Sequence, residues 1–114
     1  MTSKCNLRCK HCYGNYGTYY PDRELTGKEW AKIFKDLAKN NIFYLNISGG
    51  EPTLHPDFEM IIDSLVENKL HFMLTTNGVC NDSTLKAITK AKDYLIGTPS
   101  VLHRTPMIQN TLLH

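Results

Sequence analysis

The chain has 114 residues, a hydrophobic fraction of 41% and a formal net charge of +2, values typical of at most one ordinary soluble domain. No apolar run approaches transmembrane length, and Met1 runs directly into polar residues without the apolar stretch of a signal peptide, so neither a membrane partner nor secretion is expected. The small charge, without a basic stripe carrying interleaved aromatic residues, gives no indication of a nucleic-acid partner.

Three cysteines lie close together near the start of the chain, Cys5, Cys9 and Cys12, in the spacing C-x3-C-x2-C. Thiolates this close can converge on one metal centre from a single loop, and thiolate is the usual ligand of iron–sulfur clusters. A [4Fe–4S] cluster held by only three cysteines keeps one iron without a protein ligand. Because an open iron can bind a small molecule, the spacing favours chemistry over electron storage.

Zinc and disulfides are the alternative explanations of these cysteines. A structural zinc site needs four ligands, so His11 or the distant Cys80 would have to complete it. Zinc knots usually pair one C-x2-C with a second, and the sequence has no second pair. Disulfides suit small secreted scaffolds, whereas this chain predicts reduced thiols in a cytoplasmic setting.

A helix is predicted to follow the cysteine region, starting after Thr26. Thr26 and Glu29 fit a capping box, and the helix is expected to end near Asn40 and Asn41. Its apolar residues recur at helical spacing and predict one buried face. They are Trp30, Ile33, Phe34, Leu37 and Ala38.

Two strands and a second helix come next. The apolar run from Ile42 to Ser48 is rich in branched and aromatic residues and predicts a strand, as does the run from His71 to Thr75. Between them, Pro56 is expected to open a helix with Asp57 and Glu59 in its first turn. The apolar face of this helix comprises Phe58, Ile61, Ile62, Leu65 and Val66.

A third unit completes the periodic part of the chain. Asp82 or Ser83 is expected to cap a shorter helix, and Tyr94 to Ile96 to form a third strand. Residues 97–114 show no convincing period and read as an irregular tail that could also begin a further β/α unit. Because helices alternate with strands of nearly continuous hydrophobicity, the sequence predicts an α/β fold with parallel strands.

Glycine-containing segments directly follow the first two predicted strands. Gly49-Gly50-Glu51 comes after the first, and Thr76-Asn77-Gly78 after the second. Glycine lets a backbone approach a ligand closely, and sites of parallel barrels gather at the carboxyl ends of the strands. The alternative for both segments is an ordinary turn.

Together, three segments resemble the signatures of the radical S-adenosylmethionine (SAM) enzymes. The similarity extends from about Thr2 to Tyr94. The residues of these motifs are most similar to those of the subgroup that modifies peptides and proteins, including sulfatase-maturing enzymes. The segments are Cys5–Cys12, Ile47-Ser48-Gly49-Gly50-Glu51-Pro52-Thr53-Leu54 and Thr75-Thr76-Asn77-Gly78.

The resemblance implies a partial parallel (β/α) barrel, truncated to about three β/α units, with residues 1–96 as a partial radical SAM core domain. Barrels of this type usually need roughly 250 residues, so the first strand and the last two strands are expected to be missing. Such a piece would expose strand edges and apolar faces and tend to associate. We expect that it does not catalyse alone.

The resemblance also implies cofactors and a reaction. Cys5, Cys9 and Cys12 would bind a [4Fe–4S] cluster as metal ligands, with SAM on the open iron. A flavodoxin- or ferredoxin-type donor would supply one electron to cleave SAM, and the resulting 5′-deoxyadenosyl radical would abstract hydrogen from a peptide, protein or small-molecule substrate, an oxidoreductase-type chemistry. The implied cofactor-binding residues are His11, Tyr13, Gly49, Gly50, Glu51, Pro52, Thr76 and Asn77, with Glu51 supporting the SAM ammonium group.

Two other functions remain open. An electron carrier with a closed cluster would need a fourth ligand, for which Cys80 is the candidate. An inactive truncated relic or interaction fragment would hold no cluster at all.

Overall fold

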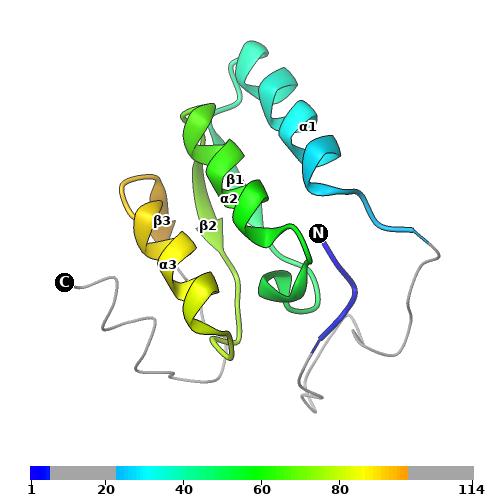
Figure 1. Ribbon diagram of the computed structural model, residues 1–114. Coiled ribbons are helices and arrows are strands. Elements are labelled where there is room, and N and C mark those ends of the chain that lie inside the picture. Colours follow the sequence, from blue (N-terminus) through cyan, green and yellow to red (C-terminus); the bar gives the residue numbers. More distant parts are fainter. Residues whose placement is uncertain (6–22, 98–114) are drawn as a thin grey trace.

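Helices and strands alternate along the computed structural model, which describes residues 1–5 and 23–97 (Figure 1). Each helix and strand predicted from the sequence is present within two residues of its expected bounds, and the short 3-10 helix η1 was not predicted. None of the helices in the described residues is long and apolar enough to cross a membrane. The order is α1 (Gly27–Lys39), β1 (Tyr44–Ile47), η1 (Pro52–Leu54), α2 (Phe58–Glu67), β2 (His71–Leu74), α3 (Asp82–Lys90) and β3 (Leu95–Gly97).

The strands form one parallel sheet in the order β1-β2-β3, as the sequence predicted. Ile47 at the end of β1 pairs with Leu74 at the end of β2. The two strands therefore end at the same edge of the sheet, and the loops that follow them start side by side. Phe72 of β2 pairs with Leu95, and the register shifts before Met73 pairs with Gly97.

The core lies between the sheet and the three helices, which cover one of its faces (Figure 1). Phe72 and Leu74 of β2 are fully buried, and burial of such a side chain contributes about 1.5–3 kcal/mol. Tyr44 and Ile96 are 52% and 54% exposed. Apolar side chains of the outer strands are thus exposed, in agreement with the expectation for an incomplete barrel. The buried apolar side chains of the helices are Phe34, Phe58, Ile61, Ile62, Leu65, Ala87 and Ile88.

The helix starts follow from local hydrogen bonds. The capping box of α1 is confirmed, because the Thr26 hydroxyl accepts from the Glu29 N–H and the Glu29 carboxylate accepts from the Thr26 N–H. The predicted cap of α3 is wrong: Asn81 occupies the extended N-cap position, and its Oδ1 accepts from the Thr84 N–H at 2.9 Å. Asp82 lies inside the first turn of the helix instead, where its charge favours the helix N-terminus.

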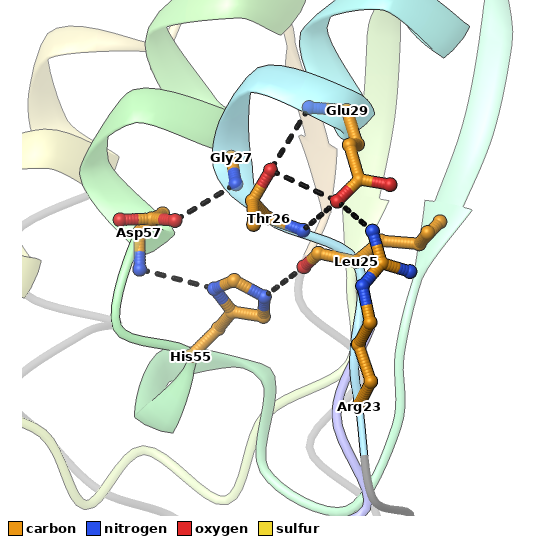
Figure 2. Close-up of polar contacts among 7 residues, drawn as sticks. All are labelled: Arg23, Leu25, Thr26, Gly27, Glu29, His55 and Asp57. Carbon is orange, nitrogen blue, oxygen red and sulfur yellow. Dashed lines mark hydrogen bonds and ion pairs between the residues drawn. The ribbon is translucent and has the colours of Figure 1, made fainter.

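The starts of α1 and α2 are joined by hydrogen bonds between residues far apart in the sequence (Figure 2). The Asp57 carboxylate accepts from the Gly27 N–H, with Oδ2 and N 2.8 Å apart. His55 is buried, and its Nδ1 accepts from the Asp57 N–H at 3.0 Å. The proton of this ring is therefore on Nε2, which donates to the Leu25 carbonyl at 2.8 Å. These bonds fix where α1 begins relative to α2.

Gly27 lies so close to α2 that no side chain fits there. A Cβ at this position would lie 2.6 Å from Cβ of Asp57 and 2.8 Å from Sδ of Met60. The glycine thus permits the close approach of the two helix starts.

Replacing Gly27 with alanine should destabilise the folded chain by about 1–3 kcal/mol, because the added methyl group forces α1 away from α2. Urea unfolding followed by circular dichroism measures this loss. Gly97→Ala is the matched control, since a Cβ at Gly97 would meet no atom within 4 Å, and it should change stability by less than about 0.5 kcal/mol. Equal losses in the two variants would contradict the steric argument.

Candidate functional site

The buried carboxylate of Glu51 connects the loops that follow β1 and β2. Glu51 is 0% exposed. Its Oε1 accepts from the N–H and the hydroxyl of Thr53 at 3.2 and 2.7 Å, and from the hydroxyl of Thr76 at 2.6 Å. Its Oε2 accepts from the Asn77 N–H at 2.7 Å. These bonds offset the cost of removing a carboxylate from water, and they hold the two loops together at the carboxyl edge of the sheet.

The segment Thr76–Gly78 forms a tight turn that leads toward α3. The Gly78 N–H donates to the Thr76 hydroxyl at 3.1 Å, and the Val79 N–H donates to Oδ1 of Asn77 at 2.9 Å. Gly78 has a φ of 79°, which glycine adopts readily. The chain continues into a helix, so this Asn-Gly pair is not the turn of a hairpin. Glu51, Thr76 and Asn77 are brought together as the sequence predicted, and the buried Pro52 begins η1 beside them.

The first four residues run alongside the loop that follows β1. The Gly50 N–H donates to the carbonyl of Thr2 and the Glu51 N–H to the carbonyl of Lys4, both at 2.8 Å. The amino group of Met1 donates to the carbonyl of Ser48 at 3.1 Å. Residues 1–4 and residues 48–51 therefore run parallel to each other, as the strands of the sheet do, although residues 1–5 form no strand. Cys5, which is partly exposed, therefore stands next to Glu51's segment at the carboxyl edge of the sheet.

Gly49 and Gly50 lack room for side chains because this N-terminal segment lies against them. A Cβ at Gly49 would lie 2.5 Å from the carbonyl oxygen of Thr2, and one at Gly50 would lie 2.4 Å from that of Lys4. The sequence predicted that these glycines admit a ligand. In the described residues, the space that a Cβ would take is filled by the backbone that leads into Cys5. A ligand contact at these glycines stays a prediction.

Glu24 binds the same segment through its side chain. Its Oε1 accepts from the Thr2 hydroxyl at 2.9 Å and from the Ser3 N–H at 3.1 Å. Partial burial acts to raise the pKa of Glu24, but the hydrogen bonds from Ser3 and Thr2 outweigh it, so this pKa lies below its ordinary value. Sequence reasoning missed Glu24, because a single acidic residue ahead of a capping box carries no motif.

The remaining predicted ligands and contacts, Cys9, His11, Cys12 and Tyr13, lie outside the described residues. Within residues 1–5 and 23–97, no three His, Cys, Asp or Glu side chains are placed to hold a metal ion. Burial raises the pKa of the Cys80 thiol, and the carboxylates of Glu51 and Asp82 act in the same direction.

An open groove of about 890 Å³ lies away from this edge, among η1, α1, α2 and the start of α3. Its lining includes Asp57, Glu59, Asp63 and Glu67 but neither Cys5 nor Glu51. The chemistry of the motifs, rather than the size of this groove, therefore identifies the candidate site.

Comparison with known proteins gives a family match over most of the chain. Residues 1–101 match the family model of the Radical SAM superfamily. Mycofactocin maturase MftC of Mycolicibacterium smegmatis is 36% identical over 95 residues, which cover 83% of this chain and 24% of that protein. GTP 3′,8-cyclase of Aquifex aeolicus is 40% identical over 96 residues, which cover 80% of this chain and 30% of that protein. The chain thus spans less than a third of the length of either relative.

Solved structures give a similar match. The crystal structure of Streptococcus suis SuiB bound to S-adenosylmethionine has a TM-score of 0.75 and 26% identity, covering 84% of this chain and 22% of that one. The structure of SuiB bound to the precursor peptide SuiA has a TM-score of 0.61 and 25% identity, covering 85% of this chain and 20% of that one. The described sheet and helices therefore match part of a larger α/β protein.

Glu51→Gln should destabilise the chain by about 1–3 kcal/mol, because the amide places an N–H₂ group against the N–H of Asn77 or of Thr53. Urea unfolding of the metal-free chain measures the loss. Glu67→Gln removes the same charge from an exposed position at the end of α2 and should have an effect of less than about 0.5 kcal/mol. A Glu51→Gln chain as stable as this control would contradict the assigned network.

Stability should depend on pH through Glu24. Folding lowers its pKa, so its ionised form stabilises the folded chain above the ordinary value of 4.5, and this contribution is lost as the pH falls through the folded pKa. The difference in unfolding free energy between the wild type and Glu24→Gln should therefore shrink as urea unfolding is repeated from about pH 7 down to about pH 3. A difference that stays constant over this range would contradict the lowered pKa.

Proposed function

The chain belongs to the radical SAM superfamily, and from this premise we propose that it is the cluster- and SAM-binding part of a peptide-modifying radical SAM enzyme. Members of the superfamily bind a [4Fe–4S] cluster and SAM. One observation carries the proposal for this chain. The backbone that leads into Cys5 is hydrogen-bonded to Gly50 and Glu51, so a cysteine of the signature and the two polar loops share one edge of the sheet.

The donor set fits an iron–sulfur cluster. Cys5 is partly exposed at the edge of the sheet, and Cys9 and Cys12 follow it closely in the sequence. Three thiolates and an open iron are the arrangement that a bound SAM requires. Cys5, Cys9 and Cys12 would hold the cluster.

When bound, the cluster and SAM supply reductive cleavage of SAM and hydrogen-atom abstraction from the substrate. The residues of this chain bind and orient them. We place the SAM contacts at Gly49, Gly50, Thr76 and Asn77, with His11, Tyr13 and Pro52 as further contacts. Glu51 has both carboxylate oxygens bonded within the chain, so it would support the SAM ammonium through its negative charge and by holding the two loops in place.

The substrate class is proposed from the relatives. MftC is named as a maturase, and SuiB was solved with a precursor peptide, which favours a peptide. GTP 3′,8-cyclase is named for a nucleotide, so a small molecule is the second candidate. A one-electron donor of flavodoxin or ferredoxin type and a cytoplasmic location complete the proposal. The rest of the enzyme would supply most of the substrate contacts, because this chain spans 24% of MftC.

Anaerobic reconstitution with iron and sulfide, followed by electron paramagnetic resonance of the reduced chain, tests the proposal. The wild type should give a [4Fe–4S] signal that changes when SAM is added, because SAM binds the open iron. Cys5→Ala should lose most of the cluster, since a three-cysteine site cannot spare a ligand.

Cys80→Ala is the matched control and should leave both the signal and its response to SAM unchanged. Loss of the cluster in Cys80→Ala would indicate a closed cluster and an electron carrier. A wild-type chain that holds no cluster, or one indifferent to SAM, would indicate a fragment without a working site.

A further inference from the structure

Glu24 lies where the segment that leads into Cys5 meets the segment that leads into α1. Its Oε1 accepts from the Thr2 hydroxyl and the Ser3 N–H at 2.9 and 3.1 Å, and from the Ser3 hydroxyl at 3.4 Å. The residues it binds stand only two and three positions before Cys5. The Thr2 side chain is buried in this contact, so the bonds are partly shielded from water.

The backbone around Glu24 is itself held in place. The carbonyl of Leu25 accepts from Nε2 of His55, and the N–H of Gly27 donates to Asp57 (Figure 2). Both partners belong to the segment that starts α2, which packs into the core through Phe58. Glu24 therefore projects from a backbone that is anchored to the core by the residues following it.

The segment Met1–Lys4 is held from two directions. Carbonyls of Thr2 and Lys4 bind the loop after β1, and Glu24 binds the Thr2 side chain and the Ser3 amide. The backbone bonds alone leave the segment bound along one side. The carboxylate adds a second attachment at a different point, which restricts how the following residue, Cys5, can be oriented.

We propose that Glu24 is a positioning residue for Cys5: it holds the backbone before this cysteine against the Gly49–Glu51 turn, so that the thiolate is presented as a cluster ligand. The inference rests on the proposed function for its final step. Groups that orient a metal ligand without touching the metal commonly change metal affinity 10- to 100-fold when removed, on the order of magnitude expected here. The position of Glu24 predicts this effect without any contact to the cluster.

Two substitutions separate positioning from charge. Glu24→Ala removes the acceptor. Glu24→Gln removes the charge but keeps Oε1, which can still accept from Thr2 and Ser3. Glu29→Ala is the control for general stability. It removes a carboxylate at the same start of α1 and breaks the capping box, which should lower the unfolding free energy by about 1 kcal/mol. Glu29 has no hydrogen bond to the described residues 1–5.

The first measurement is the rate at which the reconstituted chains lose iron to a chelator, followed by absorbance. Glu24→Ala should lose iron roughly 10-fold faster than the wild type. Glu29→Ala should stay close to the wild type, and Glu24→Gln, which keeps the acceptor but loses the charge, should lie between the wild type and Glu24→Ala. Equal rates in Glu24→Ala and Glu29→Ala would overturn the proposal, because the effect would then be one of general stability.

The second measurement needs no metal. Amide hydrogen exchange at Gly50 and Glu51 reports whether the segment is in place, since these N–H groups donate to Thr2 and Lys4 and do not contact Glu24. Exchange should accelerate roughly 5-fold or more in Glu24→Ala, as for the loss of about one hydrogen bond, by a smaller factor in Glu24→Gln, and should remain slow in Glu29→Ala. Unchanged exchange in Glu24→Ala would overturn the proposal.

The two measurements also separate this inference from the proposed function. A wild-type chain without a cluster refutes the function, and with it the role of Cys5 as a ligand, while amide exchange still decides whether Glu24 holds the segment. A wild-type chain that holds its cluster as firmly as Glu24→Ala does refutes the role of Glu24 alone.

Discussion

A buried carboxylate must be surrounded by hydrogen-bond donors, and this requirement of Glu51 organises the site. The donors come from η1 and from the loop after β2, through Thr53, Thr76 and Asn77. If either loop moved alone, a carboxylate oxygen would lose its partner inside the protein, which costs more than the bond itself contributes in water. The loops after β1 and β2 therefore behave as one unit, and the parallel register of the strands places that unit at the edge of the sheet.

The same logic extends outward to the cysteine segment. The start of α2 holds the start of α1 through His55 and Asp57, Glu24 reaches from there to the first residues, and those residues return to Gly50 and Glu51. The result is a ring in which these hydrogen bonds, nearly all of which include a backbone group, alternate with short stretches of the chain. Because the links share residues, each one restricts its neighbours, and loss of one link loosens the next.

Periodic features of the sequence were predictable and pairwise contacts were not. The apolar spacing of α1 and α2 and the continuous hydrophobicity of the strands fix the element types and the parallel sheet, because burial acts on every residue of a face. The capping box at Thr26 was readable because its partners are three residues apart. The hydrogen bonds of Glu24 and His55 join residues 21 to 30 positions apart in the sequence, and no local sequence pattern predicts them. The N-cap of α3, which is Asn81, was misplaced by one or two residues because Asn, Asp and Ser all suit that position.

The tight packing at Gly49 and Gly50 constrains the backbone of the N-terminal segment but not its side chains. The space beside these glycines is filled by carbonyl oxygens of Thr2 and Lys4, atoms that every amino acid carries, so this packing does not depend on the side chains at positions 2 and 4. The Thr2 hydroxyl, in contrast, belongs to a side chain and donates a hydrogen bond to the Glu24 carboxylate. A change of side chain at Lys4 therefore leaves this packing intact, whereas a change at Thr2 removes one bond of Glu24 and leaves the bond to the Ser3 N–H.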